Sequence, residues 1–179
     1  PIQYFFKRYS TATDLINVDI GGGTTDIAFA KDKNISHVTS FRFASNTLFE
    51  NSFSELDEDN GIVDWHKNEI LKLLEEKNLM DLIRVFNSPN NTKPANMASF
   101  LFGLKDNTIP QRAGVNVKAI DFNYILQEDE DFKIVFIIFY TAIVYHIAQI
   151  VKSLNLEVPR HISFSGNGSK VIRVITTDS

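Results

Sequence analysis

Three short stretches near the start of the chain are rich in hydrophobic and β-branched residues: LINVDI (15–20), TDIAFA (25–30) and ISHVTSFRFA (35–44). Runs of this length and composition predict β-strands, and the third alternates between apolar and polar positions over much of its length. The polar link KDKN (31–34) is short enough for a hairpin between the second and third stretches. The pattern therefore predicts a meander of three strands.

The spacing of apolar residues becomes helical after residue 44. Ser45 or Asn46 is placed to cap a helix that begins TLFENSF, and the stretch IVDWHKNEILKLLEEKN (62–78) carries its apolar residues at mostly helical spacing. We therefore expect helices to dominate as far as residue 86.

Two segments of the middle third are rich in proline, asparagine and glycine, NSPNNTKPAN (87–96) and KDNTIPQRAGVN (105–116). Such composition predicts irregular structure, on either side of the short apolar patch MASFLFGL. We expect residues 45–129 to form a mostly helical inserted subdomain, between the two parts of a core subdomain, 1–44 and 130–179.

The segment FKIVFIIFYTAIVYHIAQIVK (132–152) carries no charge between Lys133 and Lys152 and is long enough to be a candidate membrane span. Polar residues recur within it, acidic residues precede it, and Lys152 suits the C-terminus of a water-soluble helix. We favour a helix buried on most sides over a membrane span, and we expect His146 to be a hydrogen-bonded core residue.

The segment LEVPRHISFSGNGSKVIRVI follows, and it predicts a strand from His161 to Ser165, a glycine turn, and a helix that starts near Ser169. A helix, a strand, a turn and a helix in this order suit a layered α/β domain.

The stretch NVDIGGGTTDIAFA places Gly21, Gly22 and Gly23 between the first two predicted strands. Glycine costs about 0.5–1 kcal/mol relative to alanine in regular structure, so three in a row imply a compensating need. Glycine tolerates positive φ and lets another group lie against the backbone, and a bend of this kind leaves peptide N–H groups in an open concavity that suits phosphate oxygens. Thr24 and Thr25 would add hydroxyl donors beside these amides.

Two aspartates flank the glycines. Asp19, at the end of the first strand, is placed to hold a hydrated Mg²⁺ ion that bridges phosphates, or to orient an attacking water. Asp26, at the start of the second strand, could join the same water shell. Neither the G-x-x-x-x-G-K-[ST] phosphate loop nor G-x-G-x-x-G is matched. From the residues alone, a plain hairpin without a ligand stays an open alternative.

The stretch VDIGGGTTDIAF resembles the second phosphate-binding motif of the actin, heat-shock chaperone and sugar-kinase superfamily, D-x-G-G-G-T-x-D. ISFSGNGSKV (162–171) resembles the adenosine motif of the same superfamily. The sequence GGGTTD is most similar to the motif of the actin-like branch that includes FtsA and the chaperones, and less similar to that of the exopolyphosphatases. The resemblance implies the second, C-terminal lobe of such an ATPase, with a ribonuclease-H-like mixed sheet built from 14–44 and 160–166 and packed against a helix over 130–154.

The resemblance also implies the cofactors ATP and Mg²⁺ and a set of site residues. Asp19 would act through Mg²⁺-bound water or as the base for the attacking water, and Asp26 would support the water shell of the metal. The nucleotide-binding residues predicted in this way are Gly21, Gly22, Gly23, Thr24, Gly166, Asn167, Gly168 and Lys170. Thr25 is added to this set for its hydroxyl group. Asn167 stands where the family often has glycine, and the 43–51 region lacks the glycine that many relatives have there.

The function that the resemblance implies is ATP binding and slow hydrolysis coupled to lobe closure. Nothing before Asp19 encodes the first phosphate motif of the family, so we expect a missing first lobe of the same protein as partner, a chain trimmed at both ends, and no activity of this piece alone. Three alternatives stay open: a nucleotide-dependent scaffold or filament protein, a small-molecule kinase lobe, and a degenerate module that binds only proteins.

Composition narrows the partners of the chain. The 179 residues carry a formal net charge of -4, which gives no basic surface for nucleic acid or anionic lipid. Cysteine is absent, which excludes disulfides, zinc-thiolate sites and thiol catalysis and fits a reducing compartment such as the cytoplasm. A protein partner or self-association stays open. The acidic segment 55–64 does not have the ligand spacing of an EF-hand, and Trp65 is expected in the core.

Overall fold

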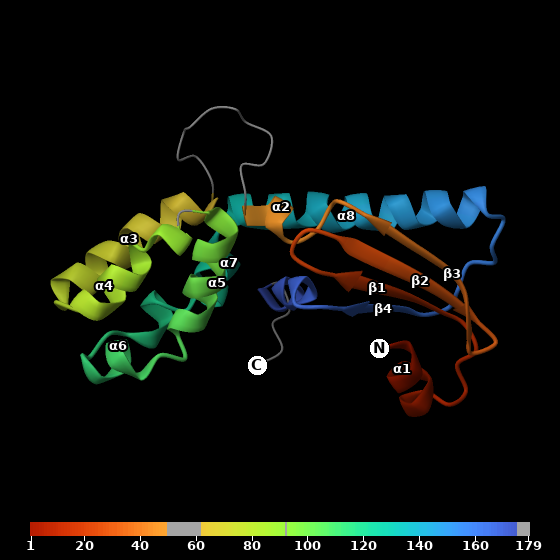
Figure 1. Ribbon diagram of the computed structural model, residues 1–179, viewed down its shortest axis with the longest axis horizontal. Helices are drawn as coiled ribbons and strands as arrows, with labels where there is room; N and C mark the ends of the chain where they lie inside the picture. Colours follow the sequence, from red (N-terminus) through yellow and green to blue (C-terminus); the bar gives the residue numbers. More distant parts are fainter. Residues whose placement is uncertain (50–61, 92, 175–179) are drawn as a thin grey trace. The chain divides into compact units, whose positions relative to one another are not determined.

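The computed structural model describes residues 1–49, 62–91 and 93–174, and its chain forms two compact units (Figure 1). Unit 1 comprises Pro1–Leu48 and Val135–Ile172, and unit 2 comprises Phe49–Ile134 and the residues from Arg173 onward. The sequence placed the corresponding boundaries at 44/45 and 129/130. Of the acidic segment 55–64, residues 55–61 lie outside the described residues.

Unit 1 is built on a four-stranded sheet with the order β3-β2-β1-β4. The strands are β1 (Leu15–Ile20), β2 (Thr25–Lys31), β3 (Asn34–Phe41) and β4 (Ile162–Ser165). β1 pairs antiparallel with β2 and parallel with β4, and β2 pairs antiparallel with β3. The predicted α/β class, with a three-strand meander and one further strand, is therefore confirmed.

The link between β2 and β3 is a tight hairpin turn. Asp32 and Lys33 have φ values of 50° and 64°. Two successive residues with positive φ are typical of a type I′ turn, whose twist matches that of the strands it joins. The third strand ends at Phe41 and not at residue 44, because the chain then turns toward a short helix.

The other regular elements of the described chain are helices. They are α1 (Ile2–Arg8), α2 (Asn46–Phe49), α3 (Ile62–Glu76), α4 (Met80–Phe86), η1 (Pro89–Asn91), α5 (Pro94–Leu104), α6 (Thr108–Arg112), η2 (Val117–Ala119), α7 (Phe122–Glu128), α8 (Glu130–Ser153) and η3 (Gly168–Val174), the η elements being 3₁₀ helices. The segment 105–116, expected to be irregular, contains α6. Asn107 starts this helix, since its Oδ1 accepts a hydrogen bond from the N–H of Ile109 at 2.9 Å.

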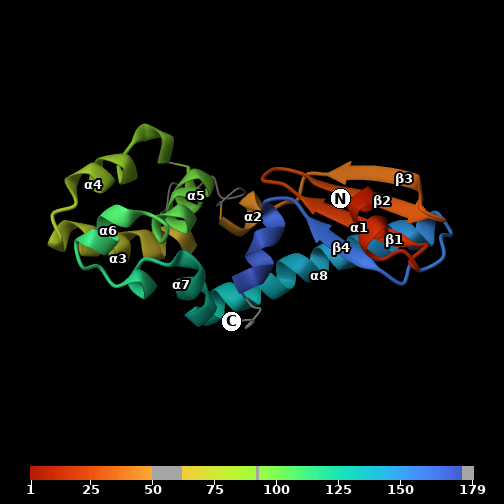
Figure 2. The same ribbon diagram turned by 90° about the horizontal axis from the view of Figure 1, so that it is seen from below.

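Helix α8 covers one face of the sheet of unit 1, while α1 lies at the other face (Figures 1 and 2). The residues of α8 that are buried recur at helical spacing: Phe132, Phe136, Phe139, Ile143, Ile147 and Val151. Phe139 stacks on Phe43 at 4.9 Å between ring centroids, and Tyr140 meets Phe164 of β4 edge to face at 5.8 Å. Aromatic contacts of this kind add to the burial of apolar area that holds the helix on the sheet.

The expectation that this helix is buried on most sides is wrong. Only 28% of its most apolar window is buried, and Ile137 and Ile138 are 59% and 62% exposed. His146 is also exposed and packs against Phe41 at 4.4 Å, instead of lying in the core. By length and composition α8 qualifies as a candidate membrane span, with a mean hydropathy of 2.2.

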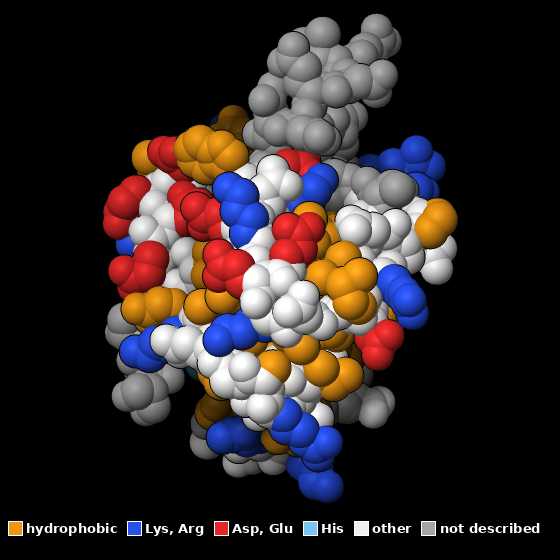
Figure 3. All heavy atoms as spheres, turned by 90° about the vertical axis from the view of Figure 1, so that its left-hand side faces the viewer, with side chains coloured by type: hydrophobic (Ala, Val, Ile, Leu, Met, Phe, Trp, Pro, Cys, Tyr) orange, Lys and Arg blue, Asp and Glu red, His pale blue; other side chains and the backbone are white. Residues whose placement is uncertain are grey.

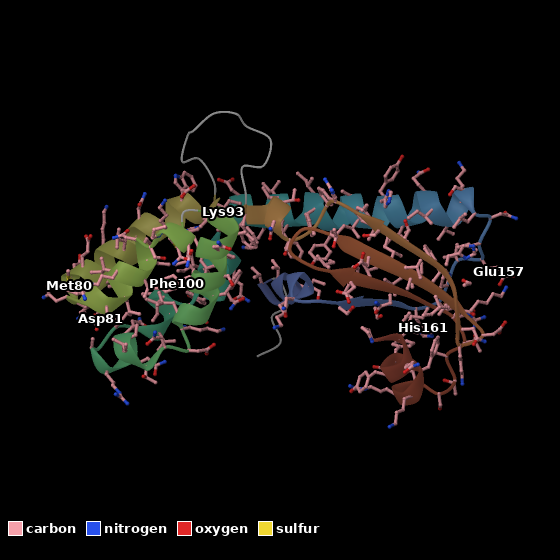
Figure 4. The ribbon with its side chains drawn as sticks, in the orientation of Figure 1. Met80, Asp81, Lys93, Phe100, Glu157 and His161 are labelled. Atoms are coloured by element: carbon pink, nitrogen blue, oxygen red, sulfur yellow. The ribbon has the colours of Figure 1, made fainter. Side chains whose placement is uncertain are left out.

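Helix α1 covers one end of the opposite face of the sheet. There Phe6 of α1, Ala12, Leu15 and Ala30 form a small buried cluster. Glu157, in the loop between α8 and β4, accepts a hydrogen bond from the Nζ of Lys31 at 3.0 Å (Figure 4). The other end of this face, where β1 runs into the glycine bend, carries polar side chains.

Unit 2 is a helical subdomain with its own core. Its most buried side chains come from several helices: Val63, Ile70 and Leu74 of α3, Leu101 and Leu104 of α5, and Phe122 and Leu126 of α7. Phe100, on α5, packs edge to face against Phe86 of α4 at 5.9 Å (Figure 4). Trp65 is not part of this core, contrary to expectation, because its side chain is 67% exposed.

Candidate nucleotide-binding site

In the bend between β1 and β2, neighbouring residues use the carbonyls of Gly21 and Gly22, whereas most of the amides are left without a partner among the described residues. The N–H of Gly21 donates to the carbonyl of Thr24 at 2.9 Å and closes the bend. The Gly21 carbonyl accepts from the N–H and Oγ of Ser45 at 3.1 and 2.8 Å, and the Gly22 carbonyl accepts from the N–H of Asn46 at 2.9 Å. Within the described residues, no group accepts a hydrogen bond from the amides of Gly22, Gly23 or Thr24. These three N–H groups are therefore free to bind an anion.

Close approach, and not positive φ, accounts for Gly21 and Gly22 of this bend. None of the three glycines of the bend has φ in the left-handed region, where Gly114 and Gly166 are found. A Cβ on Gly22 would lie 3.1 Å from Oδ1 of Asn46, whereas a Cβ on Gly23 would meet open space. Gly22 thus lets the start of α2 pack against the bend.

Two aspartates lie directly opposite each other beside the bend. Asp19 of β1 pairs in register with Asp26 of β2. Neither carboxylate forms an ion pair with any residue that the structure describes. Like charges directly opposite on a sheet are destabilising, and a bound divalent cation would remove this repulsion.

A polar strip continues from Asp19 along the same face of the sheet, and the sequence alone did not single it out. Asn17, which is buried, accepts a hydrogen bond from Oγ of Ser163 at 2.8 Å and donates to Oγ of Ser165 at 3.3 Å. The parallel register pairs Asn17 with Ser163 and Asp19 with Ser165. The alternation of Asn17 and Asp19 on one strand, matched by Ser163 and Ser165 on another, is the signal that could have found this strip.

The second glycine turn lies against the first. Gly166 has φ +85°, and a Cβ placed on it would overlap Oδ1 of Asp19 and the carbonyl oxygen of Ile20. A Cβ on Gly168 would lie 2.7 Å from the carbonyl oxygen of Gly21. The structure thus brings Asp19, the glycine bend and the Gly166 turn together, and it gives Gly168 a packing role.

The remaining predicted site residues are Thr25, Asn167 and Lys170. Thr25 is fully buried and its hydroxyl donates to the carbonyl of Phe43 at 2.6 Å. It lies on the face opposite Asp26, since neighbouring residues of a strand point to opposite faces, and we leave it out of the phosphate-binding set. Asn167 and Lys170 are exposed around the first turn of η3, where the predicted helix is a 3₁₀ helix.

The two carboxylates fit Mg²⁺ only if water and phosphate oxygens supply its other ligands. The described residues include no group of three or more His, Cys, Asp or Glu side chains that could hold a metal ion. Asp19 and Asp26 are two carboxylates, which is the number that Mg²⁺ takes when water and substrate phosphates supply its remaining ligands. The site therefore suits Mg²⁺ that arrives with a nucleotide better than a resident metal.

Comparison with known proteins leaves the family open. No protein-family model matches the chain, and no curated protein matches it. Among solved structures, a Ppx/GppA phosphatase from Aquifex aeolicus is similar over 39% of this chain and 25% of its own, with 23% identity and a TM-score of 0.23. A likeness of this extent decides neither superfamily nor branch, so the FtsA-like and chaperone-like assignment stays a prediction.

Proposed function

We propose that unit 1 is the nucleotide-binding lobe of an actin-like ATPase, and that it binds the terminal phosphates of ATP at the bend between β1 and β2. One observation supports this most directly. The amides of Gly22, Gly23 and Thr24 have no partner among the described residues, and they lie beside two unpaired carboxylates. A phosphate with its Mg²⁺ satisfies both groups at once, because it accepts hydrogen bonds and brings a divalent cation.

Each residue then has a separate task. The three amides hold phosphate oxygens, and Asp19 orients the attacking water or accepts its proton. Asp26 binds water on the metal side of the site. Bound Mg²⁺ would supply charge neutralisation of the phosphates. The exposed Asn167 and Lys170 would border the nucleoside at the Gly166 turn.

In the whole protein, this lobe would hold one half of the nucleotide and a first lobe the other half. Hydrolysis would then act as a switch, since loss of the γ-phosphate removes a ligand that joins the two lobes. A net charge of -4 argues against nucleic acid as the partner and is compatible with a cytoplasmic protein. With half of the cradle, the isolated chain is expected to bind nucleotide weakly.

A glycine-selective NMR titration tests the phosphate contact on the chain itself. The sequence contains 8 glycines, so ¹⁵N-glycine labelling gives a small set of amide signals. With Mg²⁺ and ATP, the signals of Gly22 and Gly23 are expected to shift in a saturable manner, and AMP, which lacks the terminal phosphates, should shift them much less. Gly103 and Gly114, both in unit 2, serve as internal controls.

The variant Asp19→Asn separates the role of the metal from that of the amides. It should retain shifts with ATP alone but lose the additional effect of Mg²⁺, because it removes a carboxylate and leaves the bend in place. Equal shifts at Gly103 and Gly114, or no response at Gly22 and Gly23 at millimolar ATP, would contradict phosphate binding at this bend.

A further inference from the structure

Unit 2 contains a concave site, which the proposed ATPase function does not use. It is a groove with a volume of about 740 Å³ between α3, η2 and α7. Its apolar lining comes from Ile70 and Leu73 of α3 and Ile125 of α7. We call it the α3–α7 groove. Its volume is in the range of about 300–1,000 Å³ that binding pockets have.

Aromatic side chains stand exposed on this groove. Trp65 is 67% exposed and Tyr124 37% exposed, and both line it. Tryptophan and tyrosine are enriched in protein interfaces, where they anchor a partner in a desolvated pocket. The only tryptophan of the chain thus lies where a bound partner would cover it.

The charges on the groove favour a cation. The polar groups of His66 and Asp129 are paired with each other, by a 2.7 Å hydrogen bond between Nε2 and Oδ2. Glu69 and Glu128 line the groove without an ion pair to any described residue. Among the described residues of the lining, the one lysine or arginine is Lys118, which already lies over the Tyr124 ring at 5.1 Å.

The surface at the end of unit 2 is of mixed charge. Figure 3 shows the end of unit 2 with acidic and basic side chains interspersed among hydrophobic ones. A partner attracted to the groove would therefore respond to the two glutamates, and not to a field of a single sign over the whole surface.

We propose that the α3–α7 groove binds an amphipathic helical segment of a partner protein that inserts an apolar side chain and places lysine or arginine beside it. Apolar grooves between helices commonly receive such helices, and the residues of one helical face reach the groove at regular spacing. The apolar lining would take the inserted side chain, while Glu69 and Glu128 would meet the basic residues on either side of it.

Fluorescence of Trp65 provides the assay on the full chain. The probe is a synthetic amphipathic helical peptide of leucine and lysine, compared with a peptide of the same pattern in which glutamate replaces lysine. The lysine peptide is expected to change Trp65 emission in a saturable manner. The glutamate peptide should bind at least about tenfold more weakly, because it meets two carboxylates across the interface.

Two matched double variants locate the binding. Glu69→Lys with Glu128→Lys reverses the charge of the groove and should weaken the lysine peptide about tenfold or more. Glu75→Lys with Glu76→Lys makes the same change in net charge at exposed positions of α3 outside the groove lining, and should alter affinity less than about threefold. Circular dichroism verifies that both variants retain their helices.

Three results would overturn the proposal. Equal loss in both double variants would mean non-specific attraction by charge. Binding that leaves Trp65 emission unchanged would place the peptide elsewhere. Full competition by a small alkylamine at the same affinity as the peptide would assign the groove to small amphiphilic cations instead of a protein segment.

Discussion

At the scale of single residues, Gly166 is the position that most constrains the candidate site. Its φ of +85° lies in the left-handed region, and it lets β4 turn directly over Asp19 and the end of β1. Any side chain there has to push against a carboxylate oxygen and a backbone carbonyl. The residue therefore sets the distance between the two glycine turns that the proposed function requires.

The substitution Gly166→Ala is expected to destabilise unit 1 by about 1–3 kcal/mol, from backbone strain and from overlap with Asp19. Urea unfolding followed by circular dichroism measures this loss. Gly114→Ala is the matched control, because Gly114 also has positive φ, +73°, but open space around its Cβ position. If both variants lose the same free energy, backbone strain alone explains the effect and the contact with Asp19 is unimportant.

Tyr140 presents a different constraint. Its hydroxyl is buried and has no hydrogen-bond partner among the residues that the structure describes, and burial raises the pKa of the phenol. An unsatisfied buried polar group costs about 1–3 kcal/mol. Tyr140→Phe is therefore expected to leave stability unchanged or raise it by about 1 kcal/mol, measured as a urea midpoint. A loss of more than that amount would show that the hydroxyl has a partner in solution.

At the scale of secondary-structure elements, the pattern of apolar residues predicted several strands and helices close to where the structure has them. The three strands of the meander and helices α3 and α8 lie close to their expected ranges because their apolar periodicity is long or their turn residues are specific. Helix α6 was missed because Pro110 and its neighbours suggest a loop, whereas proline is tolerated in the first turn of a helix.

Periodicity could not predict which sides of an apolar helix are covered. Helix α8 is apolar around most of its circumference, so its sequence favoured burial on most sides, yet the described residues bury only 28% of its most apolar window. Exposed Trp65 shows the same limit, since hydrophobicity does not separate a core position from a binding surface.

The contact between His66 of α3 and Asp129, at the start of α8, contributes to stability in a pH-dependent manner. Burial alone would raise the pKa of Asp129, but hydrogen bonds from the Phe132 N–H and from His66 outweigh it and hold this pKa below its ordinary 3.8. A carboxyl with a lowered folded-state pKa stabilises the protein above its unfolded-state pKa, and this contribution is lost as pH falls through the folded-state value. The contact should therefore weaken below about pH 4.

The variant Asp129→Asn is expected to be less stable than the wild type at pH 7, by about 1.5–3 kcal/mol, because it loses a charge-assisted hydrogen bond. The difference should shrink between about pH 4 and pH 2, measured by urea midpoints. Asp81→Asn, at a highly exposed ion pair, is the control and should give a curve parallel to that of the wild type. A difference that is independent of pH would contradict the role of the carboxylate.

At the scale of the whole molecule, the candidate site depends on contacts that the sequence could suggest only through motif order. The glycine bend and the Gly166 turn are separated by most of the chain, and parallel pairing of β4 with β1 brings them together. Asp19 and Gly166 were named from the sequence, whereas the polar strip of Asn17 and Ser163 depends on strand register, which no single segment encodes.

One helix also links the stability of the two units. The boundary between them falls within α8, between Ile134 and Val135. Asp129, in unit 2, starts this helix, since its Oδ1 accepts a hydrogen bond from the N–H of Phe132 at 2.9 Å. The buried positions from Phe136 to Val151 then pack within unit 1. Loss of the cap should therefore destabilise both units.

Asp129→Ala, which removes the cap as well as the hydrogen bond to His66, is expected to cost about 0.5–2 kcal/mol more than Asp129→Asn, which retains a capping side chain. Trp65 fluorescence reports on unit 2, and hydrogen exchange of the β1 amides reports on unit 1. Since helix formation is cooperative, the alanine variant should lower the protection of β1 as well as the unfolding midpoint seen at Trp65. Unchanged exchange in β1, together with a lower midpoint at Trp65, would show that the two units unfold independently in spite of the helix they share.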